Sequence, residues 1–195
     1  MDTTFSKTIR EKAFEVGFQK VGITLATTTP NEKANLEKWL NHGHHGTMEW
    51  MEKLKNERGD IHTYFPEAKS VISVGLNYFT GLNQTDLSSD LKFSNYAWGD
   101  DYHDVLKKRL FQLLGWIKGE IPDVKGVICV DTSPVMDKVW AHRAGIGWPG
   151  KHTNLITRNY GSWIFLGELI LDICLLYTSD AADERSSVDL GGRRI

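Results

Sequence analysis

Residues 70–79, SVISVGLNYF, constrain the fold of this chain more than any other segment. They are a nearly continuous run of β-branched and apolar side chains, which is typical of a β-strand covered on both faces. Two further runs have the same character: GVICVD at residues 126–131 and SWIFLGELIL at residues 162–171. Strands of this kind need other elements packed on both sides of their sheet.

Segments with helical periodicity are the candidates for the elements that cover the sheet. The longest stripe lies in residues 102–117, where five apolar side chains recur every three or four residues: Tyr102, Leu106, Leu110, Leu113 and Ile117. Residues 5–16 predict an opening amphipathic helix, and Gly17 is expected to end it. Shorter helices are predicted from Thr47 onward and over residues 135–143. Helices mixed with a few strands indicate an α/β or α+β domain.

A further helix has the clearest start signal in the chain. Thr29 has the spacing of an N-cap, Pro30 suits the first turn, and Glu32 completes a capping box. Its buried stripe is expected to contain Leu36, Trp39 and Leu40, and Gly43 is expected to end the helix.

The 195 residues are 41% hydrophobic, which suffices for one domain with a buried core. Lys and Arg total 23 against 25 for Asp and Glu, so the formal charge of -2 gives no overall attraction to a phosphate backbone. Any contact with nucleic acid therefore has to come from a local patch.

The expected compartment is the cytoplasm. The amino-terminal sequence MDTTFSKTIREKAFEVGF alternates charged and apolar residues, so it does not predict a signal peptide, and no apolar run is long enough to span a bilayer. Cys129 and Cys174 lie far apart, and neither has a CxxC partner. Two widely separated cysteines argue against a fold held together by disulfide bonds and fit a reducing cytosol.

The chain changes character after Asp172. Residues 173–195 have no sustained period and are rich in small, charged and turn-forming side chains. We interpret them as non-native sequence, such as vector read-through or a frameshift, or alternatively as a natural disordered tail. Residues 1–172 are thus expected to form the domain.

A carboxylate stands at the end of the second strand-like run, in the sequence VDTSPV. Open α/β sheets bind ligands at strand ends, so Asp131 is a candidate general acid. The alternative is that Asp131 caps a helix beginning at Pro134.

Residues 143–154, RAGIGWPGKHTN, form a glycine-rich segment. Its glycines let backbone approach a ligand, and Lys151 and Asn154 supply donors. The segment is not a nucleotide phosphate loop, because His152 replaces the hydroxyl residue that would bind magnesium.

Two other clusters could bind ligands. Residues 96–103, YAWGDDYH, have the aromatic density of a pocket wall, and Asp100 or Asp101 is expected to cap the helix that follows. Three histidines could bind a transition metal, but they lie in a glycine turn without carboxylate or thiolate, which favours a solvated loop over a metal site: His42, His44 and His45.

Four sequence blocks, taken in order, resemble the signature of the epoxyqueuosine reductase family: SVISVGLNYF, YAWGDDYHDVLKKRL, VDTSPVMDKVWAHRAGIGWPGKHTNLI and GSWIFLGELILD. The resemblance runs from the first helix to Asp172. It implies an α+β cobalamin-binding domain, nitroreductase-like or reductive-dehalogenase-like, with a mixed sheet flanked by helices. The implied activity is the reduction of epoxyqueuosine to queuosine in the tRNA anticodon loop, with electrons passing through two 4Fe-4S clusters.

The resemblance also implies roles for particular residues. Asp131 would donate the proton as the epoxide oxygen leaves. Further residues would line the corrin or the substrate base, with Arg58 near a corrin amide or a phosphate: Arg58, Tyr96, Tyr102, His103, Asp131, Lys151, Thr153 and Asn154. The implied partners are a tRNA anticodon stem-loop and an external electron donor, and a monomer is expected.

This sequence departs from the family pattern in its cysteines. A 4Fe-4S cluster takes four cysteine thiolates, so two cysteines cannot complete even one cluster. We therefore expect this chain to bind cobalamin without running the electron transfer unaided. Two alternatives remain: a corrinoid-binding or carrier module without reductase activity, and a flavin-binding nitroreductase relative.

Overall fold

The computed structural model describes residues 3–82 and 93–175, so the prediction of a tail lies, for residues 176–195, outside the described residues. Its centre is a four-stranded sheet with the strand order β1-β2-β6-β3. The strands are β1 (Lys20–Leu25), β2 (Ser70–Asn77), β3 (Gly126–Cys129) and β6 (Ile164–Leu171).

The three ladders of this sheet are all antiparallel, where the resemblance implied a mixed sheet. The sequence could not reveal the direction of pairing, because a continuous apolar run reports cover on both faces and not the orientation of neighbouring strands. The α+β class is confirmed, and the three predicted strand segments are present with shorter ends.

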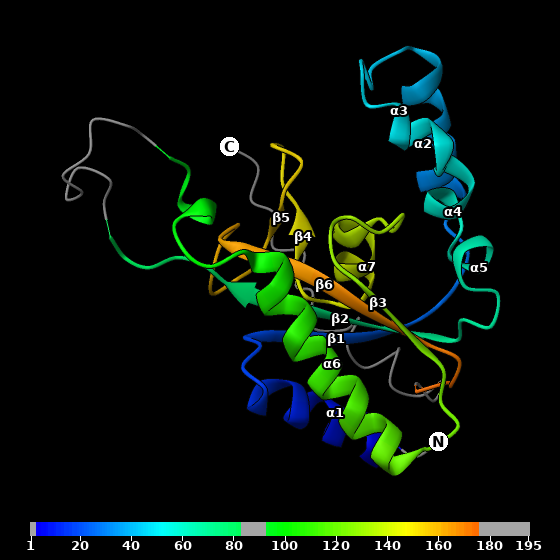
Figure 1. Ribbon diagram of the computed structural model, residues 1–195. Helices are drawn as coiled ribbons and strands as arrows, with labels where there is room; N and C mark the ends of the chain where they lie inside the picture. Colours follow the sequence, from blue (N-terminus) through cyan, green and yellow to red (C-terminus); the bar gives the residue numbers. More distant parts are fainter. Residues whose placement is uncertain (1–2, 83–92, 176–195) are drawn as a thin grey trace, which may run out of the picture.

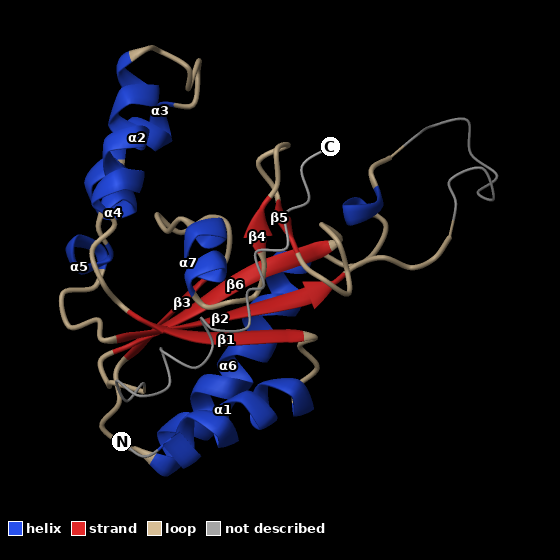
Figure 2. Ribbon diagram, turned by 180° about the vertical axis from the view of Figure 1, so that it is seen from behind, coloured by secondary structure: helices blue, strands red, loops and turns tan. Residues whose placement is uncertain are grey.

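Helices cover both faces of the sheet (Figures 1 and 2). Helices α1 (Thr3–Glu15) and α6 (Tyr102–Glu120) lie on one face, where Ile72 and Leu169 join the main apolar core. Helix α7 (Asp137–Arg143) lies on the other face, against Ile170. The predicted long helix from Tyr102 is confirmed, and α1 ends just before Gly17, whose φ of 100° suits glycine.

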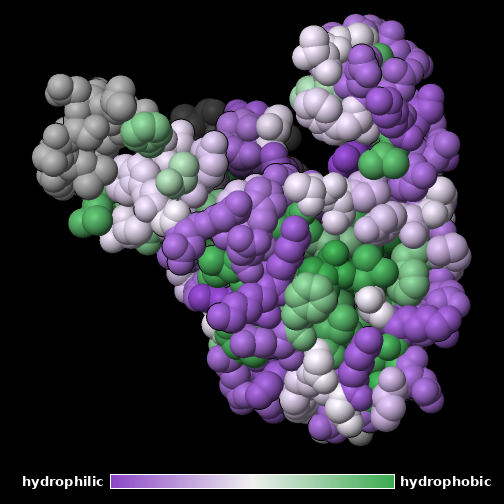
Figure 3. Space-filling view, viewed as in Figure 1, coloured by the Kyte–Doolittle hydropathy of each residue, from purple (hydrophilic) through white to green (hydrophobic). Residues whose placement is uncertain are grey.

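Four short helices form an arm that projects from one end of the sheet: α2 (Pro30–Asn41), α3 (Glu49–Lys53), α4 (Lys55–Gly59) and α5 (Ile61–Tyr64). Figure 3 shows the arm standing apart from the rest of the molecule across a notch. An apolar hollow of about 410 Å³ lies between the arm and α7, lined in part by Trp39, Met51 and Met136.

Arg143 ties α7 to the base of this arm. Its Nη1 donates to Thr27 Oγ1 at 3.1 Å and to the Thr28 carbonyl at 3.2 Å. Its Nη2 lies 3.6 Å from Glu32 Oε2. The predicted capping box at the start of α2 is therefore not formed: Thr29 occupies the N-cap position, but its hydroxyl donates to the Gly59 carbonyl instead.

Strand β1 was not predicted, because KVGITL alternates apolar side chains with Lys, Gly and Thr and is short. It is an edge strand that pairs with β2 alone. A Cβ atom at Gly22 would lie 2.0 Å from the Ala144 carbonyl oxygen, so α7 packs directly on this strand.

Two small elements complete the described structure. The 3-10 turn η2 (Asn95–Ala97) precedes α6, and a two-stranded hairpin, β4 (Trp148–Pro149) and β5 (Leu155–Ile156), follows α7. No helix of the described ranges has the length and apolar character needed to cross a membrane.

Candidate functional site

Asp131 lies at the turn that leaves β3. Val130 before it is buried, whereas the Asp131 side chain is 61% exposed. The φ of Asp131 is 41°, in the left-handed region that is uncommon for a residue with a Cβ atom, and such strain is often found at functional sites. Helix α7 begins at Asp137 with Met136 as its N-cap, so the predicted helix start at Pro134 and the capping role of Asp131 are both wrong.

The amino terminus of α6 supplies the partners of Asp131. Asp101 is the N-cap of α6, and its Oδ1 accepts the backbone N–H of His103 at 2.9 Å. The same oxygen lies 2.7 Å from His103 Nδ1, which fixes the imidazole ring. These hydrogen bonds lower the pKa of Asp101, the backbone bond most of all.

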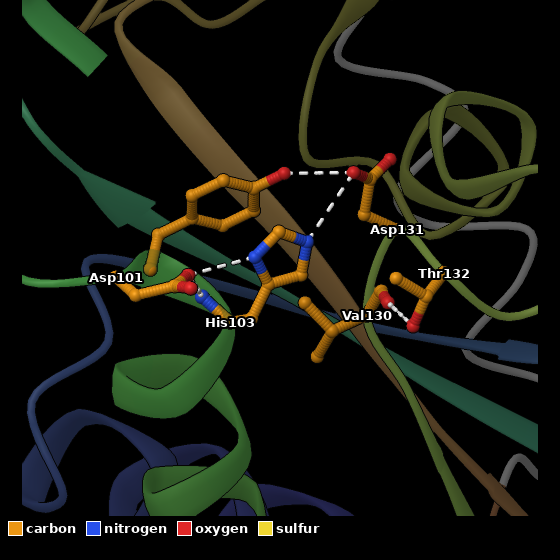
Figure 4. A network of polar contacts seen from close by, with 6 residues as sticks. Asp101, His103, Val130, Asp131 and Thr132 are labelled. Atoms are coloured by element: carbon orange, nitrogen blue, oxygen red, sulfur yellow. Dashed lines mark hydrogen bonds and ion pairs between the residues drawn. The ribbon is translucent and has the colours of Figure 1, made fainter. Parts of the chain in front are cut away.

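Two side chains of α6 contact one oxygen of Asp131 (Figure 4). The Tyr102 hydroxyl donates to Asp131 Oδ2 at 2.7 Å, and His103 Nε2 lies 3.4 Å from the same atom. Burial and then the Asp131 carboxylate raise the pKa of Tyr102, so its hydroxyl remains a donor at physiological pH. The other Asp131 oxygen points away from both groups (Figure 4), and the Asp131 side chain is 61% exposed.

A cavity of about 310 Å³ adjoins Tyr102. One wall is aromatic: the Tyr102 and Phe165 rings stack at 4.3 Å with 7° between their planes, and Tyr78 lies 4.4 Å from Phe165. The lining is completed by residues from η2, α7, the hairpin, the loop after it and β6: Tyr96, Lys138, Asn154, Leu155, Ser162, Ile164 and Leu166. A flat apolar wall facing a few polar groups is the usual composition of a small-molecule site.

The polar side of the cavity is organised by hydrogen bonds. Lys138 Nζ of α7 donates to Asn154 Oδ1 at 3.0 Å, which joins this helix to the β4–β5 hairpin. His152 Nε2 lies 3.2 Å from the Ser162 hydroxyl. Gly147 is needed for packing, because a Cβ atom there would lie 2.2 Å from the Ile156 carbonyl oxygen.

The structure brings together five of the eight residues proposed for the site. Tyr96, Tyr102 and Asn154 line the cavity, and His103 and Asp131 contact Tyr102 or its partner. The aromatic segment, the strand-terminal carboxylate and the glycine-rich turn therefore do converge in space.

The other three residues lie outside the cavity lining. Lys151 and Thr153 are exposed in the hairpin turn, where Thr153 has a φ of 67°. Arg58 lies in α4, and its Nη1 donates to the Val135 carbonyl at 3.4 Å, below the loop that follows Asp131.

Several residues near the site were missed in the sequence. Tyr78, Lys138 and Phe165 line the cavity but stood inside segments interpreted only as strand or helix. A more general signal was available at Glu168, a single charge within the apolar strand SWIFLGELIL. Buried acidic residues are uncommon without a partner, and Glu168 is fully buried.

The described residues contain no cluster of three or more His, Cys, Asp and Glu side chains suited to a metal ion. Burial raises the pKa of the Cys129 thiol to about 12, so the free thiol is protonated at neutral pH. In the histidine run, the His42 and His44 rings stack at 5.5 Å, and His42 Nδ1 contacts the Lys38 carbonyl at 2.6 Å.

Comparisons with known proteins agree on one family. Residues 58–132 match the family model described as epoxyqueuosine reductase QueG, DUF1730. The epoxyqueuosine reductase of Prochlorococcus marinus (strain NATL2A) is 44% identical over 168 residues, which are 85% of this chain and 53% of that protein.

Solved structures give the same result. The structure of an epoxyqueuosine reductase with an epoxyqueuosine-modified tRNA-Tyr stem loop has a TM-score of 0.77 at 29% identity, over 87% of this chain and 46% of that one. The Bacillus subtilis epoxyqueuosine reductase, with an aspartate catalytic loop swung out of its active site, has a TM-score of 0.76 at 26% identity. That match covers 89% of this chain and 46% of the other.

The fold and the site define an α+β domain in which a carboxyl group is presented beside an aromatic-walled cavity. The chain spans about half the length of the curated relatives that it matches. Over most of its length, the chain is similar to members of the epoxyqueuosine reductase family.

Proposed function

We propose that this chain forms the part of an epoxyqueuosine reductase that binds cobalamin and presents Asp131 to the epoxide of epoxyqueuosine in tRNA. The observation that carries this proposal is the Asp131 carboxylate, held by Tyr102 and His103 beside the cavity. Conversion of an epoxide to an alkene consumes two electrons and two protons and releases the oxygen as water. A positioned acid is therefore needed where the negative charge develops on oxygen.

Asp131 is proposed to supply that proton from its exposed carboxyl group. Tyr102 fixes the side chain through Oδ2, and its raised pKa keeps the phenol from competing as the acid. His103 lies between the carboxyl groups of Asp101 and Asp131, so its ring can pass a proton to Asp131 after each turnover. A general acid of this kind contributes a factor of about 10² to 10⁴ in rate.

The cavity fits the edge of a large flat cofactor and is too small to enclose one. The corrin rim carries amide groups, and the cavity offers hydrogen-bonding side chains to match them: Tyr96, Lys138, Asn154 and Ser162. We propose that Lys151 and Thr153, exposed in the adjoining turn, extend this contact. Cobalamin, when bound, would supply a reduced metal centre for electron transfer. A nitroreductase-like or reductive-dehalogenase-like relationship of the fold is part of this proposal.

The substrate is proposed to be an unpaired base of a tRNA anticodon stem-loop. One supporting observation is that a family relative was solved with such a stem loop. A second is that Phe79 and Trp163 are about half exposed next to the cavity wall, with their rings 5.0 Å apart. Exposed aromatic rings recognise splayed RNA bases by stacking.

The electrons would come from outside this chain, through 4Fe-4S clusters carried elsewhere and an external donor. Its two cysteines do not complete one such cluster, and the Cys129 thiol is buried. A cytoplasmic monomer is the proposed form.

The test is a two-step binding experiment on this chain. The chain is mixed with cobalamin and passed through a desalting column, and retained corrin absorbance supports cofactor binding. An epoxyqueuosine-modified anticodon stem-loop is then added, and its binding is measured by fluorescence anisotropy. Retention of the corrin without RNA binding would favour a corrinoid carrier module. Retention of a yellow flavin and no corrin would overturn the proposal.

A further inference from the structure

Glu168 is a charged residue in the interior of the sheet. It is 0% exposed and stands on β6 between Ser73 of β2 and Cys129 of β3, its partners in the two ladders. Ser73 Oγ donates to Glu168 Oε1 at 3.1 Å. Glu168 Oε2 is buried and receives no hydrogen bond from the part of the chain that the structure describes. A buried carboxylate with an unsatisfied oxygen is costly.

Asp137 meets Glu168 from the first residue of α7. The two carboxyl groups interact side chain to side chain, and Asp137 Oδ1 is also buried without a donor among the described residues. Two ionised carboxylates can only accept hydrogen bonds, so both oxygens stay unsatisfied. One proton placed between the groups satisfies both.

Electrostatics point in the same direction. Burial raises the pKa of Asp137 to about 6; the hydrogen bond with Glu168 offsets part of this rise, and the Asp131 carboxylate adds to it. Burial and then the Asp137 carboxylate raise the pKa of Glu168 well above its usual value. Arg58 of α4 is the cation that partly offsets this on Asp137. The other titratable groups that face the pair or its neighbours are neutral at physiological pH: Cys129 of β3, Tyr64 of α5 and Tyr102 of α6.

The loop formed by residues 131–136 leads from Asp131 directly into Asp137. Its far end is held by Arg58 Nη1 on the Val135 carbonyl. Displacement of the α7 amino terminus from the sheet would therefore move Asp131 away from Tyr102 and His103. The Bacillus subtilis relative, whose aspartate catalytic loop is swung out, indicates that such a loop has a second position in this family.

We propose that Asp137 and Glu168 share one proton, and that this pair holds α7 against the sheet and thereby positions Asp131. Glu168 is then a positioning residue, because it acts on Asp131 through Asp137. The role assigned to Asp131 rests on the proposed function, whereas the shared proton does not.

The sign of the pH dependence follows from the raised pKa values. Stability from the shared proton is complete below the unfolded carboxyl pKa of about 4.3 and is lost as the pH rises through the folded pKa of Glu168, which lies well above its usual value. Within that window, one extra proton bound by the folded state raises the unfolding equilibrium constant by up to about tenfold per pH unit.

The test compares Glu168→Gln with the wild-type chain from pH 5 to 8.5, without cofactor. A glutamine amide can donate to Asp137 Oδ1 while its oxygen accepts from Ser73, so it mimics the protonated acid. In urea unfolding, the free energy of unfolding of the wild type should fall as the pH rises through the titration of the pair. The variant should not show this additional fall. Hydrogen exchange of residues 131–136, corrected for intrinsic rates, should accelerate with pH in the wild type and not in the variant.

Glu37→Gln is the matched control, because it makes the same chemical change at an exposed position of α2 and should keep the wild-type slope. The proposal of a shared proton is overturned if the free energy of unfolding of Glu168→Gln keeps the pH dependence of the wild type. It is also overturned if the variant is destabilised equally at every pH. If this variant does not fold, Asp137→Asn must flatten the slope, and failure to do so overturns it too. Cobalamin retention is measured in a separate experiment. The pH dependence of unfolding therefore tests the shared proton even if the chain does not bind cobalamin.

Discussion

The two faces of the sheet differ in what they bury. Toward α1 and α6 the sheet buries the main apolar core, including Ile9, Leu110, Leu113 and Leu169 at 0% exposed, and the buried polar side chains there are the uncharged Ser6 and Ser70. Toward α7 the sheet buries Glu168 and Ser73 beside Val71 and Ile170, and the first residue of the covering helix is acidic. Hydrophobic burial stabilises the first face, and this interaction does not depend on the direction of the contacts. The stability of the second face depends on where protons and hydrogen bonds are placed.

The site takes one part from each face. Tyr102 and His103 begin α6, the helix of the apolar face, and Asp131 belongs to the loop that enters α7. A helix of the apolar face thus holds the partners of a carboxyl group whose own loop enters the helix of the polar face. We infer that stability is concentrated on the apolar face and that control of the site is concentrated on the polar one.

The largest effect is expected from Asp131→Ala in a complete enzyme that also carries the iron–sulfur portion. Turnover should fall by about 10² to 10⁴, because the proton donor is lost at the charged stage of the reaction. Cobalamin retention should change little, since Asp131 lies beside the cavity and does not line it. Turnover is measured by liquid chromatography of digested tRNA, and unchanged turnover would remove Asp131 from the acid role.

On the apolar face, Leu110→Ala should reduce the free energy of unfolding of this chain by about 2–5 kcal/mol, because it leaves a cavity among fully buried side chains. Urea unfolding followed by circular dichroism measures the loss. The paired variant is Val139→Ala on α7, where the side chain is only half-buried and a smaller loss is expected. Equal losses would contradict the proposed division between the faces.

The sequence predicted the apolar face well. A stripe at helical spacing and a run of β-branched residues both report burial, which is why α6 and β2 were found with nearly correct ends. It missed β1, where Lys, Gly and Thr interrupt the apolar pattern at the edge of the sheet. The antiparallel pairing was also missed, because burial does not encode strand direction.

The site was predicted in part, and the reason is geometric. Tyr102, His103 and Asp131 carry motif signals, and each lies at the end of a regular element. The contact between Asp137 and Glu168 depends instead on the register of three strands and on where α7 begins. Two acidic residues 31 positions apart give no local pattern for such a contact.

An intermediate effect is expected from Tyr102→Phe in the complete enzyme. The change removes the hydroxyl that holds Asp131 Oδ2 at 2.7 Å but keeps the ring that stacks on Phe165. A hydrogen bond to a charged group contributes about 1.5–3 kcal/mol, so turnover should fall by about tenfold or more while the unfolding midpoint shifts little. A variant with normal turnover would show that His103 alone positions the carboxyl group.

The smallest expected effect is a difference in cobalamin retention between alanine variants of two lysines, Lys138 and Lys151. Lys138→Ala removes a lining side chain that also donates to Asn154 at 3.0 Å, whereas Lys151→Ala removes an exposed side chain of the hairpin turn. Exposed charges contribute less than about 1 kcal/mol, so Lys151→Ala should weaken cobalamin retention by no more than a few-fold. Lys138→Ala should weaken it more, because the cavity loses both a donor and the link that holds Asn154. Equilibrium dialysis against cobalamin measures both variants. The reverse order would place the cofactor over the hairpin turn and not over the aromatic wall, and would move the control of binding away from α7.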